Sequence, residues 1–334
     1  MPTKSLVTGA NGHLGNNLVR LLVDRGDHVN AGIRNPQYRK TLEGLGCATV
    51  PADLLDRRSL VKALNGVDVI YQVGAVFKHW APNPERDIYE ANMLATRNLL
   101  EAAAHAGVQR LVYVSSIAAL DRSRLPITES SWNPDQSNIY FRSKTDSEKL
   151  AWELAQKHNL NMVSVLPGAI IGRNCLVPTP TMALLTSVID GKLPINPGFF
   201  FNFVDVEDVA EGCYSAALNG KRGERYLLAN ENCTSIEELV RHAQALFPDR
   251  NIAMPTKPPR AVVYAAAAML EVVGRLTRRE PLLQRNFLNA FTVREQCDIS
   301  KAKRELGFRP RPPNEAISSA LRYLAAAESR SIAV

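Results

Sequence analysis

The sequence has few cysteines, and those it has follow no pattern. They are odd in number and widely scattered, at Cys47, Cys175, Cys213, Cys233 and Cys297. None of them takes the close spacing of metal ligands, so we expect reduced thiols in a cytoplasmic protein, with no disulfide framework and no metal site. Residues 1–4 leave no room for a signal peptide before the first expected strand, which agrees with that location.

Long apolar runs and runs of one charge are also missing. The most apolar stretch, residues 260–276, is interrupted by Glu271 and is shorter than the roughly 20 residues of a membrane-spanning helix. We expect a buried or partly exposed helix there. A helix lying against a membrane or a partner stays open, with Arg275, Arg278 and Arg279 at its end. The net charge of +7 comes without an arginine run interleaved with aromatic residues, so we expect no nucleic-acid partner.

Apolar stretches alternate with helical stretches through the first half of the chain. This pattern predicts an α/β protein with a Rossmann-type, doubly wound parallel sheet. Strands are expected at residues 5–8, 28–33, 48–50, 69–73, 111–115 and 162–166, and helices at 13–24, 57–64, 85–105 and 139–157. We expect a nucleotide-binding domain over residues 1–170, to which the chain returns around 200–230, and a smaller, mostly helical C-terminal substrate lobe over residues 171–334.

A glycine-rich turn near the start gives the first chemical signal. The apolar residues 5–7 lead into it, and leucines recur at helical spacing after it. Gly9 allows a tight turn, Gly12 lets the backbone approach a pyrophosphate, and Gly15 lets the helix pack on the strand. The phosphates would meet the positive helix N-terminus, so we predict a dinucleotide site here. Its residues are Thr8, Gly9, Asn11, Gly12, His13, Leu14 and Gly15.

A tyrosine and a lysine farther along the chain form a second signal. Tyr140 and Lys144 lie four residues apart in an expected helix, so both side chains project from one face. The lysine charge should lower the tyrosine pKa from its usual value of about 10, which would make proton exchange easier near neutral pH. Ser115 and Ser116 lie at the end of an expected strand. The tyrosine and the lysine together suit proton transfer.

The two patterns together resemble the extended branch of the short-chain dehydrogenase/reductase superfamily, which combines Thr-Gly-x-x-Gly-x-x-Gly with Ser and Tyr-x-x-x-Lys. The resemblance implies hydride transfer between a nicotinamide and a substrate carbon, with Tyr140 as general acid and base. Lys144 would also reach the nicotinamide ribose, and Asn92 would support that lysine through water. The resemblance favours Ser116 over Ser115 for binding the substrate oxygen, because Ser116 precedes a stretch of small residues.

The end of the second expected strand favours NADP(H) over NAD(H). NAD enzymes of this fold place a carboxylate there for the ribose 2′-hydroxyl, whereas an arginine accommodates a 2′-phosphate. Here Arg34 follows the strand, with Arg39 and Lys40 close behind. By the same resemblance, further cofactor contacts are expected at Asp53, Leu54, Val73, Gly74, Ala75, Tyr140, Lys144, Pro167, Gly168 and Ile170.

Within the superfamily, the chain resembles dihydroflavonol-4-reductase-like enzymes and 3β-hydroxysteroid dehydrogenases. Residues 33–36, 112–116 and 140–144 carry the first likeness, and residues 76–85 carry the second. The substrate is expected to contact Phe77, His79, Trp80, Ser116 and Phe203. An irregular run over residues 176–203 would close over it. The resemblance also implies a homodimer through the helices at 85–105 and 139–157, because members of the superfamily commonly form one there.

The lining of this pocket favours one substrate class. Residues 176–203 are rich in phenylalanine and offer only Lys192 for a diphosphate. We therefore predict an NADPH-dependent reductase of an apolar aldehyde or ketone. The alternatives are a nucleotide-sugar epimerase or dehydratase that uses NAD(P), and a 3β-hydroxysteroid dehydrogenase. A regulator that only senses NADP(H) is disfavoured, because such proteins commonly lose the tyrosine or the lysine.

Overall fold

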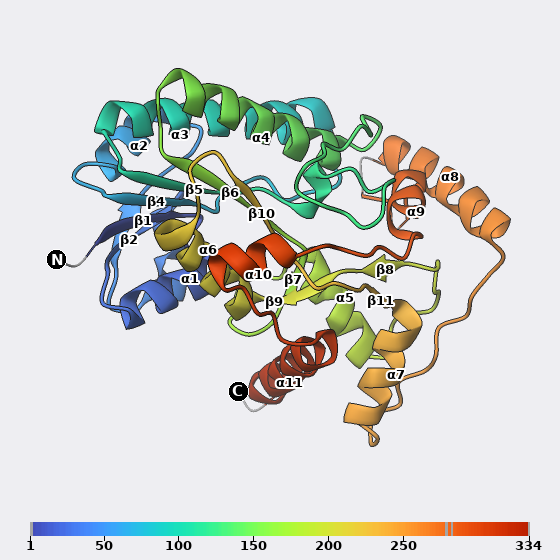
Figure 1. Ribbon diagram of the computed structural model, residues 1–334. Coiled ribbons are helices and arrows are strands. Elements are labelled where there is room, and N and C mark those ends of the chain that lie inside the picture. Colours follow the sequence, from blue (N-terminus) through green and yellow to red (C-terminus); the bar gives the residue numbers. More distant parts are fainter. Residues whose placement is uncertain (1–2, 278–279, 282, 333–334) are drawn as a thin grey trace.

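A seven-stranded parallel sheet forms the centre of the protein (Figure 1). The computed structural model describes residues 3–277, 280–281 and 283–332. The strands are β1 (Lys4–Thr8), β2 (His28–Ile33), β3 (Ala48–Pro51), β4 (Val69–Gln72), β5 (Arg110–Val114), β6 (Met162–Pro167) and β10 (Arg225–Leu228), in the order β10-β6-β5-β4-β1-β2-β3. The order reverses between β1 and β4, and such a switch point is where α/β sheets bind their ligands.

Helices cover both faces of the sheet, because successive side chains of each strand point to opposite faces. On β1, Leu6 packs beneath α2 (Arg57–Ala63), α3 (Ala91–Ala106) and α4 (Ile139–Lys157). Its neighbour Val7 packs on α1 (His13–Asp24) and α6 (Val206–Asn219). Figure 1 shows these two helical layers on either side of the strands. The predicted α/β fold with a doubly wound parallel sheet is confirmed.

The predicted elements agree closely with this half of the structure. All six predicted strands occur within a residue of their expected ends, and the helices at 13–24 and 139–157 match at both ends. The expected helix at 85–105 is divided, since it opens as a π-helix over Glu85–Glu90 and continues as α3. All five cysteines are free thiols, as expected.

The C-terminal lobe is built mainly from helices. These are α5 (Pro180–Ile189), α7 (Ile236–Leu246), α8 (Arg260–Thr277), α9 (Arg285–Phe291), α10 (Ser300–Leu306) and α11 (Pro313–Ile332). Two small sheets join them. One pairs β7 (Ala169–Ile171) with β9 (Phe203–Asp205), and the other pairs β8 (Phe200–Phe201) with β11 (Thr234–Ser235). No helix among the described residues is long and apolar enough to cross a membrane. Arg278 and Arg279, expected at the end of the apolar helix, lie outside the described residues.

The expectation of an irregular run over residues 176–203 is wrong for its middle part. Helix α5 occupies residues 180–189, and Thr179 caps it by accepting a hydrogen bond of 3.3 Å from the Met182 backbone N–H. Pro180 stands at the first helical position, where its missing N–H costs nothing. The prolines therefore start a helix instead of preventing one. Leu185 and Val188 bury the inner face of α5 in the core of the lobe, beside α7 and α11.

Candidate active site

The glycine-rich turn joins β1 to α1 at the switch point of the sheet. Gly9 has a φ of +63°, and a Cβ there would lie 2.7 Å from the Gly74 Cα. A Cβ on Gly15 would lie 2.2 Å from the Gly9 carbonyl oxygen, so helix and turn can pack this closely only without side chains. Among the described residues, no side chain caps the start of α1 at Gly12, and the first turn holds no acidic residue. The backbone N–H groups there are suited to a phosphate.

Hydrogen bonds of the Thr8 side chain connect the end of β1 to the end of β4. Its buried hydroxyl donates a hydrogen bond of 2.7 Å to Gln72 Oε1 and accepts bonds of 3.1 Å from the backbone N–H groups of Val73 and Gly74. The predicted cofactor residues Val73, Gly74 and Ala75 are thereby held against the glycine turn. The side chain of Thr8 is fully occupied in doing so, so this residue shapes the groove instead of lining it.

The side chains of His13 and Leu14 point away from the predicted phosphate position. Leu14 is buried in the core beneath α1, and His13 Nε2 lies 2.9 Å from the Arg173 carbonyl oxygen. Burial lowers the pKa of His13 to about 4, so the ring is neutral at physiological pH. Only the backbone N–H groups of these two residues are placed for a phosphate. Asn11, just before the helix, is half-buried at the mouth of the turn.

Arg34 stands where the ribose of an adenosine would be recognised. It follows β2 directly and is exposed, and no described residue pairs with its guanidinium. Arg39 and Lys40 follow in the 3-10 helix Pro36–Leu42 and are exposed as well. No carboxylate occupies the strand end, so the local charge is positive and suits a 2′-phosphate.

The remaining predicted cofactor residues follow β3, end or follow β6, or lie in β7. The Asp53 carboxylate accepts the Leu55 backbone N–H at 3.0 Å within its own turn, and Leu54 packs against the position of Gly74. Pro167 ends β6, and a Cβ on Gly168 would lie 2.6 Å from the Asn202 carbonyl oxygen. Ile170 lies in β7 and packs on the core beneath α1.

Tyr140 lies in the first turn of α4, beside Ser116. The Asn138 side chain caps the helix by accepting the Tyr140 N–H at 3.0 Å. Burial raises the pKa of Tyr140 to about 12, and the hydrogen bond with the Ser116 side chain lowers it only in part. The expected lowering of the pKa by Lys144 is not found. Desolvation of the buried phenol outweighs any effect of the lysine in this structure, so Tyr140 is protonated at neutral pH.

Lys144 follows one helical turn after Tyr140 and faces a small cavity. Burial lowers the pKa of Lys144 to about 8, while the nearby charge of Glu148 raises it. The cavity has a volume of about 10 Å³ and is lined by both Lys144 and Asn92, which is room for about one water molecule. The Asn92 amide also holds the loop after β4, because its Oδ1 accepts the Val76 N–H at 2.8 Å. Asn92 is thus placed where a water could connect it to the lysine.

The two adjacent serines have different surroundings. Ser115 is buried and donates a hydrogen bond of 2.6 Å to Glu148 Oε2. Arg225 completes this network, with its Nε and Nη2 at 2.8 and 2.9 Å from the two carboxylate oxygens. Ser116 is half-buried, accepts the Ala118 N–H at 3.1 Å and lies near enough to Tyr140 to lower its pKa. The structure therefore directs Ser116, and not Ser115, toward the tyrosine.

Aromatic rings pack against the buried ring of Tyr140. The His79 ring lies 4.5 Å from that of Tyr140, and Phe77 lies 5.4 Å from it. His79 also contacts Phe287 at 4.9 Å, and Phe287 contacts Phe291 in the same helix, α9. Burial lowers the pKa of His79 to about 4, and its Nδ1 has no hydrogen-bond partner among the described residues. A neutral ring with a spare polar atom is therefore present beside Tyr140.

Phe287 and Phe291 were not among the predicted site residues. They lie almost 150 residues after Tyr140, and only their i, i+4 spacing in a predicted helical region marked them as one face. Phe291 extends the aromatic surface to Phe199 and Phe201, at 5.8 and 5.3 Å. Phe203 differs from these, because it is fully buried in the core of the lobe and stacks on Phe201. Trp80 is half-buried in the loop that carries His79.

Arg122 and Lys192 are engaged in ion pairs, whereas Lys78, between Phe77 and His79, is exposed. Arg122 lies over the rings of Phe141 and Phe291, at 5.2 and 5.3 Å, and forms an ion pair with the buried Glu295. Lys192, the one lysine of residues 176–203, pairs with Asp190 at 2.7 Å. Apart from the exposed Lys78, these cations are therefore not free to bind a diphosphate.

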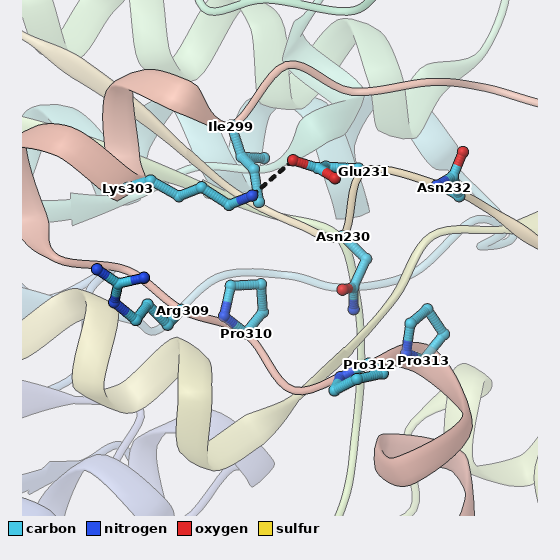
Figure 2. A pocket seen from close by; sticks show the side chains of 9 residues that line it. All are labelled: Asn230, Glu231, Asn232, Ile299, Lys303, Arg309, Pro310, Pro312 and Pro313. Carbon is cyan, nitrogen blue, oxygen red and sulfur yellow. Dashed lines mark hydrogen bonds and ion pairs between the residues drawn. The ribbon is translucent and has the colours of Figure 1, made fainter.

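A larger cavity lies elsewhere, between the loop after β10 and the chain around α10. It has a volume of about 340 Å³ and shares no residue with the predicted site. Figure 2 shows its lining, in which Lys303 Nζ bonds Glu231 Oε1 at 2.6 Å, beside a run of prolines before α11. Of its two cations, Lys303 is paired with Glu231 and Arg309 is exposed, and none of the chemistry described above reaches this cavity.

Comparison with known proteins agrees with this arrangement. The sequence profile of the NAD dependent epimerase/dehydratase family matches residues 5–229. Sterol demethylase protein B of Methylococcus capsulatus is 31% identical over 330 residues, which cover 96% of this chain and 97% of that protein. A putative dihydroflavonol 4-reductase of Synechocystis is 31% identical over 329 residues, which cover 95% of this chain and 93% of that protein. The crystal structure of gox2253 is 32% identical with a TM-score of 0.82, covering 97% of this chain and 98% of that one.

Proposed function

The chain belongs to the NAD dependent epimerase/dehydratase family and is an NAD(P)-dependent oxidoreductase of the extended short-chain dehydrogenase/reductase type, and we propose that it reduces an apolar aldehyde or ketone with NADPH. One observation carries the proposal. Tyr140 lies beside Ser116, whose side chain lowers the tyrosine pKa, and stands one turn before Lys144. Its ring contacts those of Phe77 and His79, and His79 in turn contacts Phe287. A proton donor thus lies at the edge of an apolar surface.

The residues divide the proton chemistry among them. Bound NADPH would supply the hydride to the carbonyl carbon. Ser116 donates a hydrogen bond that holds the carbonyl oxygen, and Tyr140 donates its hydroxyl proton to that oxygen as negative charge develops there. Lys144, with a pKa of about 8, is mostly cationic at neutral pH and stabilises the phenolate that Tyr140 leaves behind. The water-sized cavity between Lys144 and Asn92 supports return of a proton through water.

The preference for NADPH over NADH rests on the charge at the end of β2. Arg34 is exposed and unpaired among the described residues, and Arg39 and Lys40 lie close by. The uncapped start of α1 fits the pyrophosphate of either cofactor. Only the 2′-phosphate distinguishes the two, so Arg34 is the residue on which the preference depends.

The apolar substrate class rests on the rings and on the paired cations around them. An aromatic surface binds flat apolar compounds well. A diphosphate would need free basic groups, whereas Arg122 and Lys192 are engaged by Glu295 and Asp190. Two relatives, a putative dihydroflavonol 4-reductase and a sterol demethylase protein, have names that agree with an apolar polycyclic substrate. A sterol or hydroxysteroid is therefore our second candidate.

A panel of aldehydes, ketones, hydroxysteroids and nucleotide sugars, followed by NADPH absorbance, tests the proposal. We expect turnover of apolar carbonyl compounds and none of nucleotide sugars. An epimerase would instead be purified with bound nucleotide at near full occupancy, and that result would overturn the reductase proposal. Tyr140→Phe separates a reductase from a cofactor sensor. It should lower turnover at least about a hundredfold and leave NADPH affinity nearly unchanged.

We also propose a homodimer through α3 and α4, which pack side by side on one outer face (Figure 1). Leu94 of α3 is exposed there, which supports a contact at this face. Sedimentation of Leu94→Glu against the wild type tests it. If the Leu94→Glu variant remains a dimer despite its new negative charge, the dimer interface does not lie on α3 and α4.

A further inference from the structure

Helix α8 presents an outward face that is apolar along its whole length. Leu276 is 80% exposed, Met269 65% and Val262 56%. Val272 and Val273 are about half exposed and complete the stripe at i, i+3 and i+4 spacing. We define the α8 face as Val262, Met269, Val272, Val273 and Leu276. It runs for about 21 Å along the helix at 1.5 Å per residue, and exposed apolar surfaces of this kind mark interaction sites.

The opposite side of α8 is already packed on the protein. Val263 and Ala267 are buried against Leu288 of α9 and the ring of Phe199. Glu271, which interrupts the apolar stretch, pairs with Arg285 at 2.8 Å. Figure 1 shows α8 at the rim of the molecule, with α9 on its inner side. The α8 face therefore has no partner within the described residues and needs one from outside.

Positive charge is concentrated around this helix. Residues 254–285 contain six cationic and two acidic residues, a net charge of +4 out of +7 for the whole chain. The cations are Lys257, Arg260, Arg275, Arg278, Arg279 and Arg285, of which the side chains of Arg275, Arg278 and Arg279 are counted from the sequence alone. Lys257 and Arg260 are exposed at the start of α8. An apolar stripe flanked by cations is complementary to a lipid surface with anionic headgroups.

The same charge argues against a second copy of the chain as the occupant. A two-fold symmetric contact would place the same face against itself, so two segments of +4 would meet across it. Like charges facing each other oppose such a contact. We propose that the α8 face docks peripherally on an anionic bilayer, with its apolar side chains inserted at the headgroup boundary and its cations in contact with the headgroups.

This docking would bring the candidate site close to the bilayer. Helix α9 connects the two, because Leu288 packs under α8 and Phe287 contacts His79 beside Tyr140. An apolar substrate could then pass from lipid to the ring-lined surface, a consequence that rests on the proposed function. The docking itself does not rest on it, and its test needs no turnover.

Co-sedimentation of the full chain with vesicles tests the proposal. The vesicles are phosphatidylcholine alone or phosphatidylcholine with phosphatidylglycerol, each at low and high salt. We expect binding to the anionic vesicles, weaker binding at high salt, and little binding to phosphatidylcholine alone. The double variant Met269→Gln/Leu276→Gln should bind at least about tenfold more weakly, because two apolar insertions are lost. Both residues are exposed, so folding should be retained, and thermal unfolding checks this.

Leu218→Gln is the matched control. Leu218 is 64% exposed in α6, away from α8, and its replacement should leave vesicle binding unchanged. Three results would overturn the proposal: no binding of the wild type to anionic vesicles, equal loss in Leu218→Gln and the double variant, or a dimer that dissociates in the double variant. The last result would assign the α8 face to a second copy. Ketone reduction by the same proteins is measured in parallel in detergent-free buffer without vesicles. It tests the proposed function separately from vesicle binding.

Discussion

The Ser115 hydroxyl donates a hydrogen bond of 2.6 Å to the Glu148 carboxylate. Glu148 is fully buried, is shared with Arg225, and follows Lys144 by one turn of α4. The bond thus fixes the end of β5 against α4, which keeps Ser116 and Tyr140 in register. It also places a negative charge near Lys144, where it raises the lysine pKa against the effect of burial.

The two serines should respond differently to removal of the hydroxyl. Ser116→Ala should lower kcat/KM about ten- to hundredfold, because a hydrogen bond to developing charge contributes about 1.5–3 kcal/mol. Ser115→Ala should keep most of the activity and lower the free energy of unfolding by about 1–3 kcal/mol, since it leaves a buried carboxylate with one partner fewer. Steady-state kinetics and denaturant unfolding of both variants measure this. The reverse pattern would mean that Ser115 binds the substrate.

The rate of carbonyl reduction should fall as the pH rises through about 8. Lys144 is cationic below its pKa of about 8, and its charge is lost above that value, so phenolate stabilisation is lost in the same direction. Tyr140, whose pKa burial raises to about 12, stays protonated over this range. The alkaline limb of kcat against pH therefore reports on the lysine.

Glu148→Gln should move that alkaline limb to lower pH. Without the carboxylate, nothing at this position raises the pKa of Lys144 against burial. The exposed Glu153, farther along α4, is the matched control, and Glu153→Gln should leave the midpoint in place. Because Glu148→Gln also weakens the pairing of Arg225, its unfolding should be measured alongside. If Glu148→Gln is destabilised but the midpoint of its alkaline limb does not move, Glu148 has only a structural role.

Arg34→Ala should weaken NADPH binding by about one to two decades and barely change NADH binding. Charge-assisted bonds to a 2′-phosphate contribute about 1.5–3 kcal/mol, and NADH has no such phosphate. Titration of both cofactors by fluorescence measures the difference. Arg39 and Lys40 are near enough to reduce the loss. Arg58→Ala is the control, since Arg58 is likewise exposed but lies in α2. Equal affinity of the wild type for the two cofactors would remove the basis for the preference.

Local patterns were enough to predict the sheet half of the protein. The glycine turn, the alternating apolar strands and the Tyr140–Lys144 spacing each depend on residues close together in sequence, and the structure has the expected elements within about a residue. The sequence favoured Ser116 over Ser115 only through the family resemblance, and it did not show that Ser115 is engaged by Glu148. That network also includes Arg225, which reaches Glu148 from a strand 77 residues farther along the chain.

The C-terminal lobe was harder to predict from the sequence, because its structure also depends on contacts between residues far apart along the chain. Its helices are defined by packing of α5, α7 and α11 on one another, and the prolines of residues 178–180 gave no sign that one of them starts a helix. The pKa of Tyr140 also departed from expectation. The sequence shows a lysine one turn away, but it does not show how deeply the fold buries the phenol, and burial is the larger effect.

Phe287→Ala should change which substrates are reduced. The ring lies 4.9 Å from His79 and 6.0 Å from Phe291, so its removal takes away one wall of the aromatic surface while Ser116, Tyr140 and Lys144 stay in place. We expect kcat/KM for a bulky apolar ketone to fall about tenfold, because loss of apolar pocket contacts costs about 1–3 kcal/mol in specificity. A small aldehyde, which does not reach α9, should change little. Phe247→Ala, at the end of α7, is the control and should affect both substrates equally or not at all. An equal fall for both substrates in Phe287→Ala would show that this ring supports the fold and does not select the substrate.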